Sequence, residues 1–162
     1  MAKSKQSRVA DKAAQRTATP AIDNRRARFE YHILESMEAG VVLTGTEIKS
    51  IRQNGVSLNE AYARLRDGEM WLLGMHVAPY KEGSFSNHEP NRPRKLLLHK
   101  EQVARLGKAA AEKGLTLVPL RLYFTRGKVK IEIGLARGKK FWDKRESSAK
   151  RDVEREMARH VR

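Results

Sequence analysis

The chain has 162 residues, the length of one ordinary domain, and a hydrophobic content of 40% that supplies one modest core if the ends are left out. Its formal net charge of +15 favours a polyanionic partner such as nucleic acid. The absence of cysteine excludes disulfides and thiolate metal sites, and no apolar run approaches the roughly 18 residues of a membrane span. The N-terminus also lacks the apolar core of a secretory signal, so we expect a cytoplasmic location and no membrane partner.

The positive charge is concentrated at the two ends of the chain. Residues 1–28 contain eight basic and two acidic residues, and residues 137–162 contain ten and five, so the ends hold +11 of the +15. Residues 1–23 have too few large apolar side chains to bury, which is typical of disorder. The sequence therefore predicts a disordered basic arm at 1–23, a folded domain at 24–136 and a basic C-terminal tail at 137–162.

The folded domain is predicted to begin with strands. The run YHILESM at 31–37 favours a strand, and the Glu-Ala-Gly that follows predicts a hairpin turn in which Gly40 takes a positive φ. Thr44 precedes Glu47 by three residues, which is the spacing of a capping box. A short helix of about two turns is expected to follow.

Two more hairpins and a longer helix are predicted in the second half of the domain. Apolar and polar residues alternate on both sides of Asp67-Gly68, and again around residues 125–128. Residues 79–93 are rich in Gly, Pro, Ser and Asn and predict an exposed loop, whereas the run KEQVARLGKAAAEKG predicts a helix that ends at Gly114. Six strands and two helices give a mainly β domain, a small antiparallel barrel.

Catalytic motifs are missing from the sequence. It has no P-loop, no dinucleotide-binding glycine pattern, no nucleophile elbow and no HExxH, and its five histidines are scattered. We therefore expect no enzyme activity, no catalytic residues, no metal and no cofactor.

Basic clusters are the positive signal for function. They are Arg25, Arg26 and Arg28; Arg92, Arg94 and Lys95; Lys128 and Lys130; and Arg137, Lys139 and Lys140. Any one of them is ordinary for a solvated surface, but four on one small domain favour contact with the phosphates of RNA or DNA.

The aromatic residues fall into two groups. Those on predicted strands are expected in the core: Tyr31, Tyr62, Trp71, Tyr123 and Phe124. Phe141 and Trp142 instead lie in a highly charged segment, where an aromatic ring is placed either to stack on a base or to dock back on the barrel.

The C-terminal tail has a thin apolar stripe at Ala149, Val153, Met157 and Val161. A helix of this length buries too little to be stable alone, so we expect the tail to be disordered and to order only on a partner. The alternative is a fraying charged terminus.

Five segments of the chain together resemble the small protein B (SsrA-binding protein) family, which partners transfer-messenger RNA in bacterial ribosome rescue. They are NRRARFEY (24–31), EAGVVLTGTEIKSIR (38–52), NRPRKLLLH (91–99), GLTLVPLRLYF (114–124) and GKKFWDKR (138–145). Their order and spacing match over residues 24–145, which makes the likeness far more specific than any single motif.

The resemblance implies a fold, partners and an RNA-binding site. The fold is an oligonucleotide-binding-type (OB-like) barrel without catalytic activity, which holds the tRNA-like domain of transfer-messenger RNA near its D-loop and elbow. By matched position Glu38, Leu97 and Lys130 look like RNA-binding residues, and the neighbouring cations Arg94, Lys95 and Lys128 are added to them. The family's aminoacylated RNA is accompanied by elongation factor Tu, and we expect a monomer.

The resemblance also implies a role for the tail. In family members the tail enters the decoding centre and the empty mRNA channel of the small ribosomal subunit, where it folds as a helix. The residues that match this ribosome-binding pattern are Arg137, Lys139, Lys140, Trp142, Asp143, Lys144 and Arg145. Trp142 stands where family members often carry His or Tyr, so stacking is the role expected of it.

Two other classes of function use the same features. A basic ribosomal protein would need the same charges, and an RNA-cleaving barrel would need an acid–base pair, for which the sequence gives no support. The resemblance favours delivery of transfer-messenger RNA over both.

Overall fold

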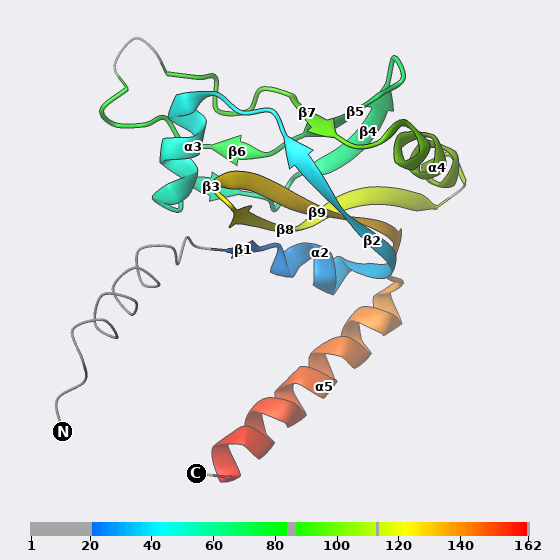
Figure 1. Ribbon diagram of the computed structural model, residues 1–162. Coiled ribbons are helices and arrows are strands. Elements are labelled where there is room, and N and C mark those ends of the chain that lie inside the picture. The colour runs from blue at the N-terminus through cyan, green and yellow to red at the C-terminus, as the bar shows by residue number, and fades with distance from the viewer. Residues whose placement is uncertain (1–20, 84–86, 113, 162) are drawn as a thin grey trace, which may run out of the picture.

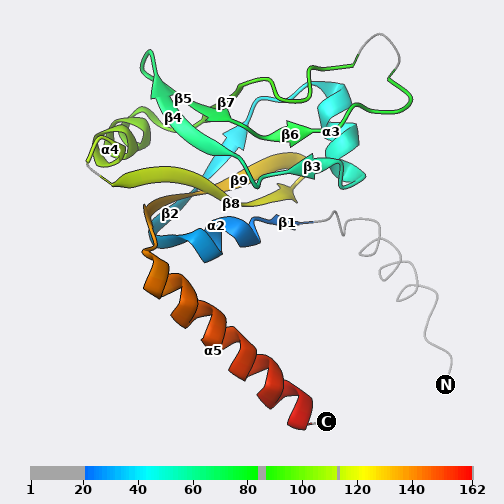
Figure 2. The same cartoon turned by 180° about the vertical axis from the view of Figure 1, so that it is seen from behind.

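The structure is a computed structural model that describes residues 21–83, 87–112 and 114–161. Its helices and strands, labelled in Figure 1 and seen from behind in Figure 2, are β1 (Ile22–Asp23), α2 (Arg25–Glu30), β2 (Tyr31–Val41), α3 (Gly45–Arg52), β3 (Val56–Ser57), β4 (Tyr62–Arg66), β5 (Glu69–Leu73), β6 (His76–Val77), β7 (Arg94–Leu97), α4 (Lys100–Ala110), β8 (Leu115–Thr125), β9 (Lys128–Gly138) and α5 (Phe141–His160). The described residues are therefore mainly β with four helices, and the expectation of two helices is corrected.

The main sheet is antiparallel, and its strand pairs form a closed circuit. The strand order is β1-β8-β4-β5-β7-β2-β9, and β9 also pairs with β8. The long strands β2, β8 and β9 make most of this circuit, while β3 and β6 form a separate two-stranded sheet. Both views show α3 and α4 at opposite sides of the sheet, with α2 against β8 and β9 and with α5 beyond it.

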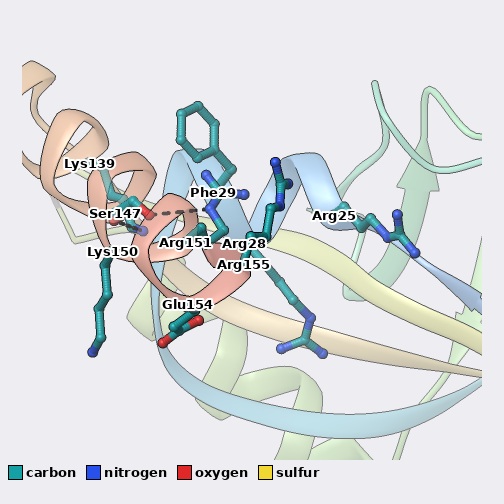
Figure 3. A pocket seen from close by; sticks show the side chains of 9 residues that line it. All are labelled: Arg25, Arg28, Phe29, Lys139, Ser147, Lys150, Arg151, Glu154 and Arg155. Atoms are coloured by element: carbon teal, nitrogen blue, oxygen red, sulfur yellow. Dashed lines mark hydrogen bonds between the residues drawn. The ribbon is translucent and has the colours of Figure 1, made fainter. Parts of the chain in front are cut away.

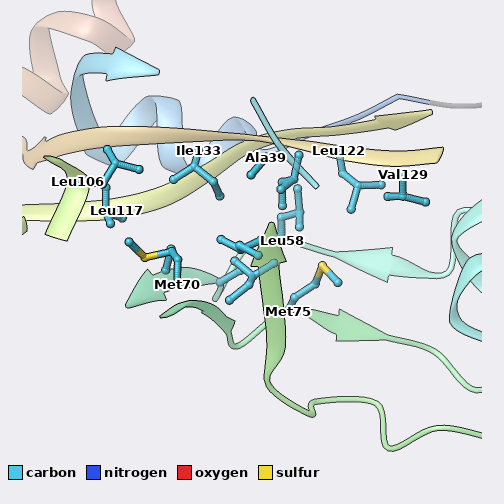
Figure 4. Packing of buried hydrophobic residues seen from close by; sticks show 14 of the residues in the cluster. Ala39, Leu58, Met70, Met75, Leu106, Leu117, Leu122, Val129 and Ile133 are labelled. Carbon is cyan, nitrogen blue, oxygen red and sulfur yellow. The ribbon is translucent and has the colours of Figure 1, made fainter. Parts of the chain in front are cut away.

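The core lies inside this circuit because the strands alternate buried and exposed residues. Leu72, Ile131 and Ile133 are fully buried, and Met70 and Met75 belong to the same core cluster. Figure 4 shows Met70 and Met75 across the interior from Ile133.

A second, smaller cluster lies on the other side of β8 and β9. There Ala27 of α2 packs with Val118, Leu120 and Ala136. This contact fixes α2 on the outer face of the sheet.

The turns predicted from local sequence are confirmed. Thr44 and Glu47 form the predicted capping box at the start of α3. Asp67 and Gly68 both have positive φ, as a type I′ turn between β4 and β5 requires, and so do Arg126 and Gly127 between β8 and β9. The described parts of the predicted loop at 79–93 contain no helix or strand.

Two other local predictions are wrong. No hairpin turn forms at Gly40, because β2 continues through it and pairs with β9 on one side and β7 on the other. The helix predicted to end at Gly114 ends at Ala110, and Gly114 takes a φ of 85° further on.

Parts of both predicted tails lie within the described residues. The disordered arm at 1–23 lies almost wholly outside the described residues, but Ile22 and Asp23 pair with β8 and so belong to the fold. Within the predicted C-terminal tail, Phe141–His160 form α5. Its first turn is capped by Asp143, which accepts a hydrogen bond from the Lys140 backbone N–H at 3.2 Å.

Candidate nucleic-acid interface

The outer face of β7, β2, β9 and β8 brings three of the predicted RNA-binding residues together. Strand register places Leu97 beside Gly40, Gly40 beside Lys130, and Lys130 beside Tyr123, in one row across four strands. Glu38 is two residues from Gly40 on the same face of β2. Residues distant in sequence therefore form one surface.

Glu38 lies between a cation and a hydrogen-bond donor. Lys130 Nζ is 3.8 Å from Glu38 Oε1, and the Tyr123 hydroxyl donates a hydrogen bond to Glu38 Oε2. Burial of the phenol and its bond to Glu38 raise the pKa of Tyr123 to about 12. A carboxylate repels phosphate, but this one is oriented and its charge is partly balanced, which makes it compatible with an RNA site.

Leu97 supplies the apolar part of this surface. Its side chain is 53% exposed, and a Cβ added at Gly40 would lie 3.1 Å from Leu97 Cβ. Glycine at position 40 therefore gives the leucine room to lie flat over β2, where it can contact a base or a sugar.

Two further predicted cations border the row. Lys128 lies on the same face of β9 as Lys130 and is exposed. Lys95 lies on the same face of β7 as Leu97 and forms an ion pair with Glu69. Both amines can reach a phosphate placed over the row.

Arg94 is corrected, because its side chain is fully buried and is not available to RNA. It donates hydrogen bonds to Glu47 Oε1 at 2.8 Å and to the Met75 carbonyl at 2.7 Å. Arg92 binds the other oxygen of the same carboxylate at 2.6 Å. Burial would raise the pKa of Glu47, but its bonds to Arg92, Thr44 and Arg94 outweigh burial and hold the pKa below its usual value. These residues tie α3 to β7 and are structural.

Tyr123 was expected in the core but lies on the outer face of β8 beside Lys130. A signal was present: Arg121, two residues before it on the same strand, is a residue type that faces solvent. Tyr62 and Trp71 likewise lie on the outer face, where Tyr62 is exposed and Trp71 is half-buried.

The predicted ribosome-binding residues lie at the opposite end of β2 and β9. Arg137 is the penultimate residue of β9, and Lys139 donates its backbone N–H to the Glu30 carbonyl at 2.8 Å. Trp142 is 62% exposed and does not dock on the sheet; the Lys140 ammonium lies 5.0 Å from its ring centre. Asp143 lies 3.4 Å from His32 Nε2, while Lys144 and Arg145 follow in the first turns of α5.

The described residues contain no group of three or more His, Cys or acidic side chains placed to hold a metal ion. None of the helices in the described ranges has both the length and the apolar character needed to cross a membrane.

The chain is similar to proteins of one known family. The family model for SmpB protein matches residues 21–162. An SsrA-binding protein of Carboxydothermus hydrogenoformans is 56% identical over 140 residues, which are 86% of this chain and 94% of that protein. One of Trichodesmium erythraeum is 55% identical over 141 residues, covering 86% and 90%.

A solved structure is also similar to the chain in sequence and in fold. A chain of the structure described as "tmRNA-SmpB: a journey to the center of the bacterial ribosome" is 52% identical, with a TM-score of 0.65, and the match covers 75% of this chain and 86% of that one. The family model and relatives at this level of identity and coverage leave one conclusion, which is that the chain belongs to the SmpB protein family.

Proposed function

We propose that the chain binds transfer-messenger RNA (SsrA RNA) and acts with it on stalled ribosomes in trans-translation. The relatives are named for SsrA binding, and the similar solved structure is described as tmRNA-SmpB in the bacterial ribosome. The observation that carries the proposal is the row of Leu97, Gly40 and Lys130 beside Glu38, which joins a cation, an apolar surface and an oriented acceptor on one face. The function is binding and not catalysis.

The RNA-binding residues are Glu38, Leu97 and Lys130, with Lys95 and Lys128 at the border. Lys130 and Lys128 neutralise phosphates, Leu97 contacts a base or sugar, and Glu38 accepts hydrogen bonds from a base edge or a ribose hydroxyl. The ligand is the tRNA-like domain near its D-loop and elbow. The closed circuit of strand pairs supports an OB-type barrel over residues 24–136, a fold whose face commonly binds nucleic acid.

The tail at 137–162 is the ribosome-binding segment. Arg137, Lys139, Lys140, Lys144 and Arg145 bind ribosomal RNA phosphates, and Asp143 caps the helix. The exposed ring of Trp142 stacks on a base of the decoding centre. The tail then lies as a helix in the empty mRNA channel of the small subunit.

The remaining parts of the proposal concern the setting of this activity. The protein acts as a monomer in the cytoplasm, where ribosomes are found. It reaches the ribosome with aminoacylated transfer-messenger RNA and elongation factor Tu.

The test is binding of the purified chain to transfer-messenger RNA and to bulk tRNA at near-physiological salt. We expect strong preference for transfer-messenger RNA, and Lys130→Gln should weaken that binding and reduce the slope of log K against log salt by about one. Lys108→Gln, which removes an exposed charge from α4, is the matched control. Equal, steeply salt-dependent binding to both RNAs would instead favour a basic ribosomal protein.

A further inference from the structure

A basic cleft of about 590 Å³ lies between α2 and α5 (Figure 3). Arg25, Arg28 and Phe29 of α2 form one wall. The other wall is Lys139 together with one side of α5: Ser147, Lys150, Arg151, Glu154 and Arg155. The cleft thus combines the basic cluster at 25–28 with the tail, two segments more than a hundred residues apart in sequence.

The side of α5 that faces α2 is the basic one. The residues in the cleft recur at helical spacing from Ser147 to Arg155, so they share one face of the helix. The apolar stripe lies elsewhere, since Val153 is 50% exposed and Met157 is 63% exposed. An amphipathic helix that docked by apolar burial would place its apolar stripe against α2 and its basic residues toward solvent.

A cation–π contact joins α5 to α2, in which the Arg151 guanidinium lies 4.7 Å from the centre of the Phe29 ring. The Lys139 backbone N–H, just before α5, donates to the Glu30 carbonyl at the end of α2. Within the tail, Arg151 donates a hydrogen bond to the Ser147 carbonyl at 3.2 Å, and Lys139 Nζ donates to Ser147 Oγ at 3.0 Å.

Most of the positive charge in the cleft is not neutralised. Six cations and one carboxylate, that of Glu154, line the cleft, and Arg155 also lies 3.8 Å from Asp152 Oδ1. Within the described residues no ion pair engages Arg25, Arg28 or Lys150, whereas Arg26, which does not line the cleft, binds Glu30 and Glu60. Two like-charged walls repel each other, and a polyanion between them removes that repulsion.

We propose that the α2–α5 cleft holds a stretch of ribosomal RNA backbone, so that Arg25 and Arg28 contact the ribosome together with Lys150 and Arg155. This inference rests on the proposed function, in which the tail binds the ribosome, and adds a second helix to that site. Exposed arginines on both walls suit successive phosphates along a strand, because each guanidinium can bind a phosphate through two N–H groups. Lys130 and Gly138 are about 26 Å apart along β9 at about 3.3 Å per residue, so the cleft is separate from the transfer-messenger RNA face.

The test uses the full chain, purified small ribosomal subunits and labelled transfer-messenger RNA. Arg25→Gln with Arg28→Gln should weaken subunit binding about tenfold or more and lower the slope of log K against log salt by about 1.5, while transfer-messenger RNA affinity stays within twofold. Lys150→Gln with Arg155→Gln should give a similar loss from the other wall. The control removes two exposed charges outside the cleft, with Lys81→Gln and Lys108→Gln, and should change neither affinity beyond twofold.

The possible outcomes separate the two proposals. Arg25→Lys with Arg28→Lys keeps the charge and should keep most of the subunit affinity. Unchanged subunit binding in both glutamine variants would overturn the cleft proposal, and so would an equal loss of transfer-messenger RNA binding, because the cleft would then belong to that RNA. Failure of the proposed function shows instead in the wild-type chain, as equal affinity for transfer-messenger RNA and tRNA.

Discussion

At the scale of single residues, the hydrogen bond from Tyr123 to Glu38 has a consequence for pH. Burial and this bond favour the neutral phenol, so the pKa of Tyr123 rises from 10.0 to about 12. The stabilisation is present below pH 10.0 and is lost as the pH rises through about 12. The ionisation of the four tyrosines can be followed by absorbance as the pH is raised. The ionisation step that is lost in Tyr123→Phe should be one that occurs at high pH in the wild-type chain. Glu38→Ala should lower its pKa toward the usual value, and no change there would contradict the bond.

Arg94 gives a second prediction at this scale, for stability. It is fully buried and paired with Glu47, so Arg94→Met leaves that carboxylate buried with one partner fewer. We expect a loss of about 3–5 kcal/mol. The melting temperature should fall by about 10 °C.

Lys95→Met is the neighbouring control for Arg94→Met. Because Lys95 is partly exposed and paired with an exposed Glu69, its loss should change stability by about 1 kcal/mol or less. It should instead weaken RNA binding, whereas folded Arg94→Met should bind RNA normally. The opposite pattern would restore Arg94 to the interface.

Arg94 and Lys95 show why the orientation of a single side chain could not be predicted from the sequence. In the run RKLLL, apolar and polar residues do not alternate, so the sequence does not reveal which basic residue faces inward. Only the pairing of β7 with β2 and β5 sets that orientation, and the pairing is a long-range property.

At the scale of elements, the exposed apolar residues of α5 permit a test of the helix itself. Val153→Pro with Met157→Pro removes helical hydrogen bonds at a cost of about 3 kcal/mol each. Since Val153 and Met157 lie away from the sheet, circular dichroism should report loss of helix while the melting temperature of the domain is kept. Rescue of stalled ribosomes should be lost and RNA affinity kept.

Alanine at the same two positions is the matched control for the proline variant. Val153→Ala with Met157→Ala retains the helix because alanine is the best helix former. If the proline variant rescues ribosomes fully, a helical tail is not needed.

Removal of the whole tail gives an independent prediction. The sequence predicts a boundary between residues 136 and 137, but Arg137 and Gly138 pair with β2, so truncation should follow Lys140. That chain should bind transfer-messenger RNA within a few-fold of the full-length chain and should lack function on stalled ribosomes. A large loss of RNA affinity would contradict separate binding sites.

The elements that could be predicted are those with local causes. The turn at Asp67-Gly68 and the capping box of Thr44 depend on residues within four positions of one another. The short helix α2 was not predicted, although Asn24 caps it locally by accepting a hydrogen bond from the Ala27 N–H at 3.1 Å. Asn24 is also held by bonds from its amide to the distant carbonyls of Leu58 and Pro119, at 3.0 and 2.8 Å, which no local pattern reveals. Its Ala27 is buried on strands near the other end of the sequence.

At the scale of the whole molecule, a net charge of +15 indicates that the protein binds a polyanion, but it does not tell how many polyanions bind or on how many faces. The resemblance found Glu38, Leu97 and Lys130 individually, and strand register makes them neighbours. The cleft between α2 and α5 depends on the docking of two helices, which no local pattern in the sequence encodes.

The division into two binding faces predicts additivity. Lys130 and Gly138, which precedes the first cleft residue of the tail, are about 26 Å apart along β9, so the effects of the two faces on binding should be independent within about 0.5 kcal/mol. A variant that combines Lys128→Gln and Lys130→Gln with Arg25→Gln and Arg28→Gln should bind transfer-messenger RNA as the first pair does alone. It should bind the small subunit as the second pair does alone. Both affinities can be measured over the same salt series, and a combined loss larger than either pair predicts would mean that one RNA spans both faces.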